Sequence, residues 1–151
     1  MIATVIDFAD LLLAALLAGA MFGAWLILRP AGLDAVTYVV QQQNGIRALN
    51  SVMPALGGLT LLMTLAAALL ARADRARLSL LIAAAVCLLA AGLITRFLNQ
   101  PINAVVMTWA ASAPPAEWTQ LRDEWWRWHL VRLGFALIAL SLTITAALRR
   151  A

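Results

Sequence analysis

The chain has 151 residues, of which 64% are hydrophobic and only 12% are charged, with a mean hydropathy of +0.91. Soluble domains are usually closer to half apolar, so this composition excludes an ordinary soluble protein and predicts a single all-α integral membrane domain over residues 1–151. The net charge is +4, and all eleven basic residues are arginine. Because basic residues of membrane proteins mark loops and lipid headgroups, this charge does not indicate a nucleic-acid partner.

Four apolar segments approach the length of about 20 residues that a helix needs to cross a bilayer. They lie at about residues 4–28, 51–71, 78–98 and 130–148. Backbone groups in lipid must pair within their own segment, so each is expected to be helical. The sequence therefore predicts a transmembrane four-helix bundle with its two longer, helical connections on one face at the membrane interface. Small residues on the first three spans also permit self-association into a homo-oligomer.

The orientation is predicted from the short turn ARADRAR at 71–77, whose three arginines favour the cytoplasmic side. Both termini, with Arg149 and Arg150, would then be cytoplasmic, and the bacterial inner membrane is the expected location. The two long connections carry six arginines, which argue against this orientation. Asp7 and Asp10 begin the first span, where acids are common at helix starts, and their role is left open.

The first long connection, RPAGLDAVTYVVQQQNGIRALN, is expected to hold a helix of its own. Pro30 ends the preceding span, and Asp34 is suited to cap a new helix. Gln43, Arg47 and Asn50 then share one helical face. This polar face points either to solvent or into the bundle, and the spacing alone favours solvent.

The second long connection opens with TRFLNQPIN at 95–103, where Arg96, Asn99 and Asn103 share a helical face. Pro101 has no amide hydrogen and leaves the carbonyl of Phe97 without its usual donor. The sequence therefore predicts either a kink near the membrane surface or a helix end capped by asparagines.

A long helix over residues 115–148 is expected next, about 51 Å at 1.5 Å per residue, against a hydrocarbon thickness of about 30 Å. Its first half, WTQLRDEWWRWHLVR, holds four of the six tryptophans and the one histidine. Trp118, Arg122, Trp125, His129 and Arg132 follow the spacing of a helix–helix seam. Ionisable groups between transmembrane helices mark functional sites, whereas Trp128, and in part Trp125, are expected at the lipid headgroups.

These residues resemble the anthrone oxygenase family. The resemblance rests on NQPIN at 99–103, on Trp109, and on the pattern W-x3-R-x3-W-x2-H-x2-R from Trp118 through Trp126 to Arg132; Gly23, Trp25, Pro30, Gln43, Asn50 and Pro54 also stand in suitable places. The family contains small four-helix membrane proteins, whose fungal members oxidise polyketide anthrones to anthraquinones. The resemblance implies a cofactor-independent monooxygenase that acts on an acidic aromatic substrate with O2.

The same resemblance implies roles for the polar residues. His129 would be the general base, Arg122 and Arg132 would stabilise the enolate oxygen, and Asn99 and Asn103 would orient the substrate. The residues expected to complete substrate binding are Trp118, Trp126, Trp109, Gln43, Arg47 and Asn50. One cysteine and one histidine argue against a protein metal site, and no cofactor is expected. The alternatives are a non-catalytic membrane module for binding, transport or partner assembly, and a quinone or haem redox subunit.

Overall fold

The computed structural model describes residues 1–30 and 32–149, and the regular elements in these ranges are all helices. They are α1 (Ile2–Ile27), α2 (Ala35–Leu49), α3 (Val52–Leu70), α4 (Arg75–Ile94), η1 (Thr95–Asn99), α5 (Gln100–Val106) and α6 (Trp118–Leu148). Four of these stretches are long and apolar enough to cross a membrane: α1, α3, α4 continued through α5, and α6. The predicted all-α, four-helix membrane fold is confirmed, while the exact limits of the spans stay a prediction.

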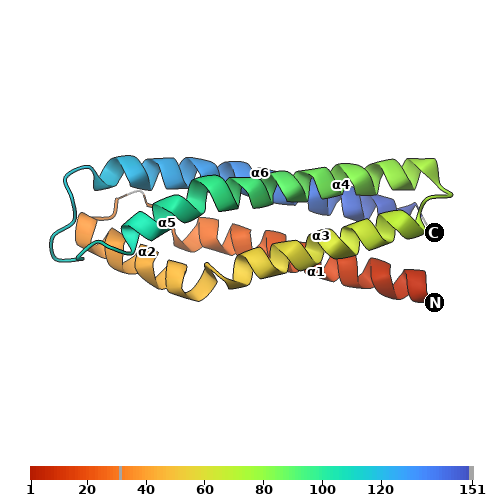
Figure 1. The fold of residues 1–151 in the computed structure, drawn as a ribbon, viewed down its shortest axis with the longest axis horizontal. Helices are drawn as coiled ribbons and strands as arrows, with labels where there is room; N and C mark the ends of the chain where they lie inside the picture. The colour runs from red at the N-terminus through yellow and green to blue at the C-terminus, as the bar shows by residue number, and fades with distance from the viewer. Residues whose placement is uncertain (31, 150–151) are drawn as a thin grey trace.

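The four long helices run lengthwise beside one another, with α1 packed on α3 and α6, and α4 packed on the same two helices. The N-terminus, the end of α6 and the α3–α4 turn lie at one end of the bundle (Figure 1). Helices α2 and α5 lie at the other end (Figure 1). The two long connections therefore share one face, as the sequence predicts.

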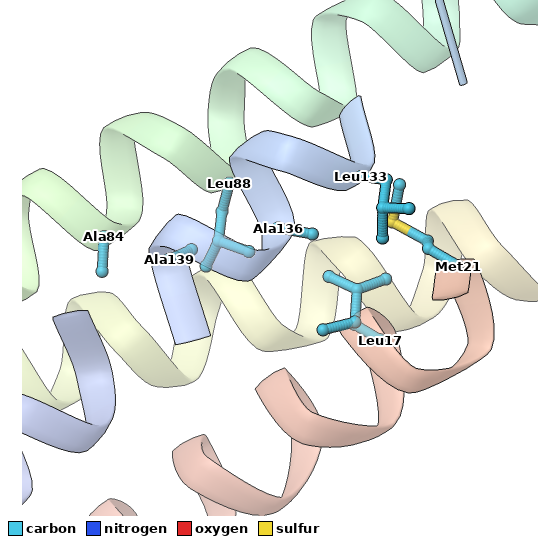
Figure 2. Close-up of a cluster of buried hydrophobic side chains, with 8 residues drawn as sticks. Leu17, Met21, Ala84, Leu88, Leu133, Ala136 and Ala139 are labelled. Carbon is cyan, nitrogen blue, oxygen red and sulfur yellow. The ribbon is translucent and has the colours of Figure 1, made fainter. Parts of the chain in front are cut away.

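Small and aliphatic side chains form the centre of the bundle. Leu17, Met21, Leu88 and Leu133 meet there, and alanines of α4 and α6 lie beside them (Figure 2). Lipid tails are as apolar as these side chains, so helix association in a bilayer depends on close packing rather than on the exclusion of water. Alanine permits this packing because it lets neighbouring backbones approach closely.

The ends of α1, α2 and α6 follow local signals. Helix α1 stops at Ile27, before Pro30, and the Asp34 carboxylate caps α2 by accepting from the Thr37 amide at 3.0 Å, as predicted. Helix α6 begins three residues later than the predicted position 115. The reason is a separate turn, closed by the Trp118 amide donating to the Pro115 carbonyl at 3.1 Å.

The interruption expected at Pro101 takes the form of a π-helical turn at Thr95–Asn99. In this turn the Gln100 amide donates to the Thr95 carbonyl, five residues back. The wider turn accommodates a proline ring that would clash inside a regular α-helix. The helix continues into α5, and Asn99 makes no side-chain cap, so the alternative of a capped helix end is wrong.

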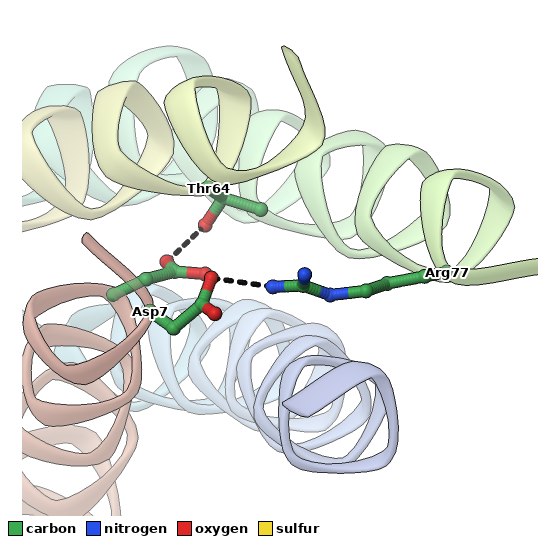
Figure 3. Close-up of polar contacts among 4 residues, drawn as sticks. Asp7, Thr64 and Arg77 are labelled. Carbon is green, nitrogen blue, oxygen red and sulfur yellow. Dashed lines mark hydrogen bonds and ion pairs between the residues drawn. The ribbon is translucent and has the colours of Figure 1, made fainter. Parts of the chain in front are cut away.

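A polar cluster ties the helices together at the end that carries the termini. Asp7 of α1 pairs with Arg77 of α4, and buried Asp10 lies 2.6 Å from the Thr64 hydroxyl of α3 (Figure 3). Both acids therefore make contacts between helices. Arg77 is turned into the bundle and is not a free loop charge, which weakens the charge argument for orientation. The cytoplasmic position of the termini stays a prediction, and Arg150 lies outside the described residues.

Candidate active site

A cavity of about 290 Å³ lies among the four long helices toward the α2 and α5 end. Leu17, Met21 and Leu88 close it toward the bundle centre. Its polar lining includes Asn50, Asn103, His129, Arg96 and Arg132, and Trp125 supplies an aromatic wall. None of the lining residues in the described part of the chain is Asp or Glu. The lining thus combines apolar surface with positive charge.

The His129 side chain is buried, with 1% exposure, and stands between two indoles. It stacks on Trp125 with ring centroids 5.2 Å apart and planes 6° from parallel, and the Trp126 ring lies tilted at 5.6 Å. The backbone of Met21 interacts with the ring, but Nε2 has no hydrogen-bond partner of normal geometry among residues 1–30 and 32–149. A buried polar atom without a partner is costly, and here it belongs to a cavity-lining side chain.

Arg132 contacts the Nδ1 edge of this imidazole. Its Nη2 and Nε lie 3.1 and 3.4 Å from His129 Nδ1, and its Nη1 donates to the Thr95 hydroxyl at 3.1 Å. A guanidinium can only donate hydrogen bonds, so Nδ1 must be the acceptor. In a neutral imidazole the single proton then sits on Nε2. The hydrogen-bond pattern therefore assigns an N–H donor to the unpartnered atom.

Asn103 links the aromatic wall to the end of α2. Its Oδ1 accepts from Trp125 Nε1 at 2.8 Å, and its Nδ2 donates to Asn50 Oδ1 at 2.9 Å. Asn99 is fully buried behind the wall and donates to the Trp125 carbonyl at 3.0 Å. Asn103 and Asn50 line the cavity, whereas Asn99 can act only through Trp125. The expectation that Trp125 lies partly among lipid headgroups is wrong, because this indole is 6% exposed and held by Asn103.

Trp118 and Arg122 belong to a different part of α6. The Arg122 guanidinium lies 4.8 Å from the Trp118 ring centroid and pairs with exposed Asp123 at 2.7 Å. Trp118 also contacts Tyr38 of α2, at 5.4 Å between centroids, and burial raises the pKa of the Tyr38 hydroxyl. Arg122 lies seven positions before His129, about 10 Å along the helix, and neither Trp118 nor Arg122 lines the cavity.

The three residues of the polar face of α2 have different surroundings. Gln43 is buried and donates to the carbonyls of Val106 and Trp109 at 3.0 and 2.9 Å, so the solvent-facing interpretation is wrong for this residue. Its amide thus binds two carbonyls at and just beyond the end of α5, and the Val106 carbonyl also accepts from the Trp109 amide at 3.2 Å. Arg47 is exposed and donates to Asn44 at 2.9 Å. Of this face, only Asn50 lines the cavity.

Several cavity residues were missed by the sequence interpretation. Gln42, Thr95 and Gln100 line the cavity, and Gln42 is 2% exposed. A glutamine next to Gln43 gave no signal of its own, since three glutamines stand in a row there. Arg96 shares the helical face of Asn103, a relation that helical spacing does reveal.

The model of the anthrone oxygenase family matches residues 44–142, about two thirds of the chain. The matched segment includes Asn50, Asn103, Trp125, His129 and Arg132. No curated protein and no solved structure matches the chain. The family match confirms the resemblance found in the sequence, and the chain belongs to the anthrone oxygenase family.

Proposed function

We propose that this protein is a membrane-embedded oxygenase that oxidises a planar, acidic aromatic substrate of the anthrone type with O2 and needs no bound cofactor. The observation that carries the proposal is the buried side chain of His129, which lines a cavity with an aromatic wall and whose Nε2 has no hydrogen-bond partner of normal geometry in the described part of the chain. Arg96 and Arg132 make the lining positive, and no acid of the described chain lines it. Such a site favours the anion of a flat carbon acid over its neutral form.

The reaction converts a ring methylene into a carbonyl. The methylene first loses a proton, which leaves an enolate whose negative charge rests on the ring oxygen. The enolate carbon then bonds to O2 and forms a hydroperoxide, which loses water to give the quinone. One methylene and one dioxygen molecule thus become one carbonyl and one water. One oxygen atom enters the product, and the other leaves as water with both methylene hydrogens.

His129 is proposed to donate a hydrogen bond from Nε2 to the enolate oxygen. The sequence favours a general base at this position, but a base needs a free lone pair on the nitrogen that meets the substrate. That arrangement would put a proton on Nδ1, opposite the Arg132 guanidinium, where two donors would face each other. In the donor role, Nδ1 accepts from the Arg132 guanidinium and Nε2 donates to the enolate oxygen. The methylene proton is then transferred to water at the polar end of the cavity, beside Asn50 and Arg96.

The other proposed site residues support this pair. Trp125 stacks against the substrate rings, and Asn103 holds the indole in place through its 2.8 Å hydrogen bond. Asn99 positions the same helix turn from behind. Trp126 braces the imidazole. Gln43 fixes α2 against the end of α5, so it shapes the site without lining it.

The test is the rate of quinone formation under 18O2 by detergent-purified protein with a hydroxyanthrone. We expect quinone with one 18O atom in the new carbonyl, formed faster than in a protein-free sample. Saturable binding of the hydroxyanthrone without faster turnover would contradict the proposal. It would support the alternative of a non-catalytic module for binding, transport or partner assembly.

A further inference from the structure

The cavity is open on one side of the bundle. Seven of its lining residues are exposed, and they are Asn50, Pro54, Gly58, Leu89, Gly92, Leu93 and Arg96. Six of the seven lie on α3, on α4 or on the turn that continues α4, and Asn50 lies two residues before the start of α3. The lining residues of α1 and α6 are all buried or half-buried. The cavity therefore opens between α3 and α4.

Glycines make this opening. Gly57 and Gly58 stand on α3, and Gly92 stands on α4. A Cβ atom added to Gly58 or Gly92 would meet no heavy atom within 4 Å, so the space beside both backbones is open. Figure 1 shows α3 and α4 leaving their shared turn and separating toward the end where α2 and α5 lie.

The opening lies between two segments that are long and apolar enough to cross a membrane. Gly92 is four residues from Arg96, about 6 Å along the helix, and belongs to a stretch apolar enough to cross a membrane. Leu89 and Leu93 flank it with exposed fractions of 50% and 48%. Aliphatic side chains of this kind face hydrocarbon in a bilayer. The side of the opening at Gly92 therefore leads to lipid, while Asn50 and Arg96 form its polar end.

We infer that the substrate enters sideways from the bilayer, through a portal formed by Gly57, Gly58 and Gly92 between α3 and α4. This inference rests on the proposed function and narrows its substrate to lipid-soluble planar aromatics that carry a polar oxygen. The apolar rings pass the glycines and stack on Trp125, and the oxygen reaches the buried side chain of His129, which lines the cavity. A water-soluble, polar substrate would not partition into the bilayer and so would not use this route.

The test closes the portal without touching the catalytic groups. Leucine at Gly58 and Gly92 adds side chains into open space. Leucine also has a higher helix propensity than glycine, so the Gly58→Leu/Gly92→Leu variant should fold. Gly19→Leu is the matched control. Gly19 is an exposed helical glycine on α1, also with no atom within 4 Å of an added Cβ, and it does not line the cavity.

Binding is measured with anthraquinone, which is not turned over, in phosphatidylcholine vesicles that contain the protein. The signal is the tryptophan quenching that is lost in Trp125→Phe. We expect saturable quenching whose onset is at least tenfold slower in the Gly58→Leu/Gly92→Leu variant and within twofold of wild type in Gly19→Leu. Equal rates in wild type and the double variant would overturn the lateral route, and so would quenching that never saturates.

A second copy of the chain is the other occupant that could cover this face. With Cys87→Ala as background, Gly92→Cys would then form disulfide-linked dimers in vesicles under mild oxidation. Such dimers would overturn the portal, whereas reaction with a lipid-soluble maleimide would support it. Quenching does not depend on turnover, so a failed oxygen assay with intact, portal-dependent quenching would reject the oxygenase and keep the lateral route.

Discussion

The hydrogen bond between Trp125 and Asn103 is predicted to hold the aromatic wall of the cavity. Asn103→Ala removes the acceptor for Trp125 Nε1 at 2.8 Å and the donor to Asn50 at 2.9 Å. Hydrogen bonds between transmembrane helices contribute about 0.6 kcal/mol each, and a buried donor left without a partner costs a further 1–3 kcal/mol or so. The free energy of unfolding should therefore fall by about 2–4 kcal/mol.

A double-mutant cycle isolates this contact. Trp125→Phe keeps an aromatic ring but removes the donor, so Asn103→Ala should be less harmful in that background. We expect a coupling energy of about 1–2 kcal/mol, measured by denaturing-detergent titration followed by circular dichroism. The control is Asn44→Ala, an exposed residue of α2, which should be additive with Trp125→Phe. Additivity of the Asn103 and Trp125 changes to within about 0.3 kcal/mol would refute the reasoning.

Three further predictions concern His129, the Asp7–Arg77 pair and Asp34. His129→Gln keeps an N–H donor but cannot take up a proton, so oxygen uptake should stay within tenfold of wild type with a similar pH profile. If the glutamine variant is as inactive as His129→Ala, the result would instead support His129 as the general base. Arg77→Gln removes the guanidinium from a carboxylate with 12% exposure and should lower the free energy of unfolding by about 3 kcal/mol. Asp7→Asn added to it should recover part of the loss in the same detergent titration, and no recovery would contradict the ion pair. Hydrogen bonds from Thr37 hold the pKa of the Asp34 carboxyl below its usual value, so its stabilising effect is present above about pH 4 and fades as the pH falls through the lower, folded value. Asp34→Ala should flatten this part of an acid titration of stability, and an unchanged acid limb would contradict the cap.

The membrane bundle could be predicted from the sequence because a bilayer leaves few choices. Apolar length decides which segments can cross, and four crossings put both long connections on one face. The cap at Asp34 and the interruption at Pro101 depend on neighbours within four residues, so local signals were sufficient. The relation of His129 to Arg132 also follows from helical spacing, since residues three apart are neighbours on a helix.

The positions of the other site residues depend on contacts between segments that are distant in the sequence, so they could not be predicted. Trp125 and Trp126 are adjacent, and a rotation of about 100° per residue decides which indole lines the cavity. The sequence interpretation favoured Trp126 for substrate binding, but Trp125 is the one that lines the cavity. The seam spacing also includes Trp118 and Arg122, but the first turns of α6 contact α2 through Tyr38 and lie away from the cavity. The carbonyls that accept hydrogen bonds from Gln43 are more than sixty residues away along the chain, and no local pattern predicts these contacts.

The central claim is that His129, in its cavity, accelerates the oxidation of an acidic aromatic compound by O2. The most direct measurement is oxygen uptake by detergent-purified protein with a hydroxyanthrone, comparing wild type, His129→Ala and the Gly19→Leu control. We predict uptake well above the protein-free rate for wild type and Gly19→Leu, and a return to that rate for His129→Ala. Uptake by wild type at the protein-free rate, or equal uptake by wild type and His129→Ala, would contradict the account.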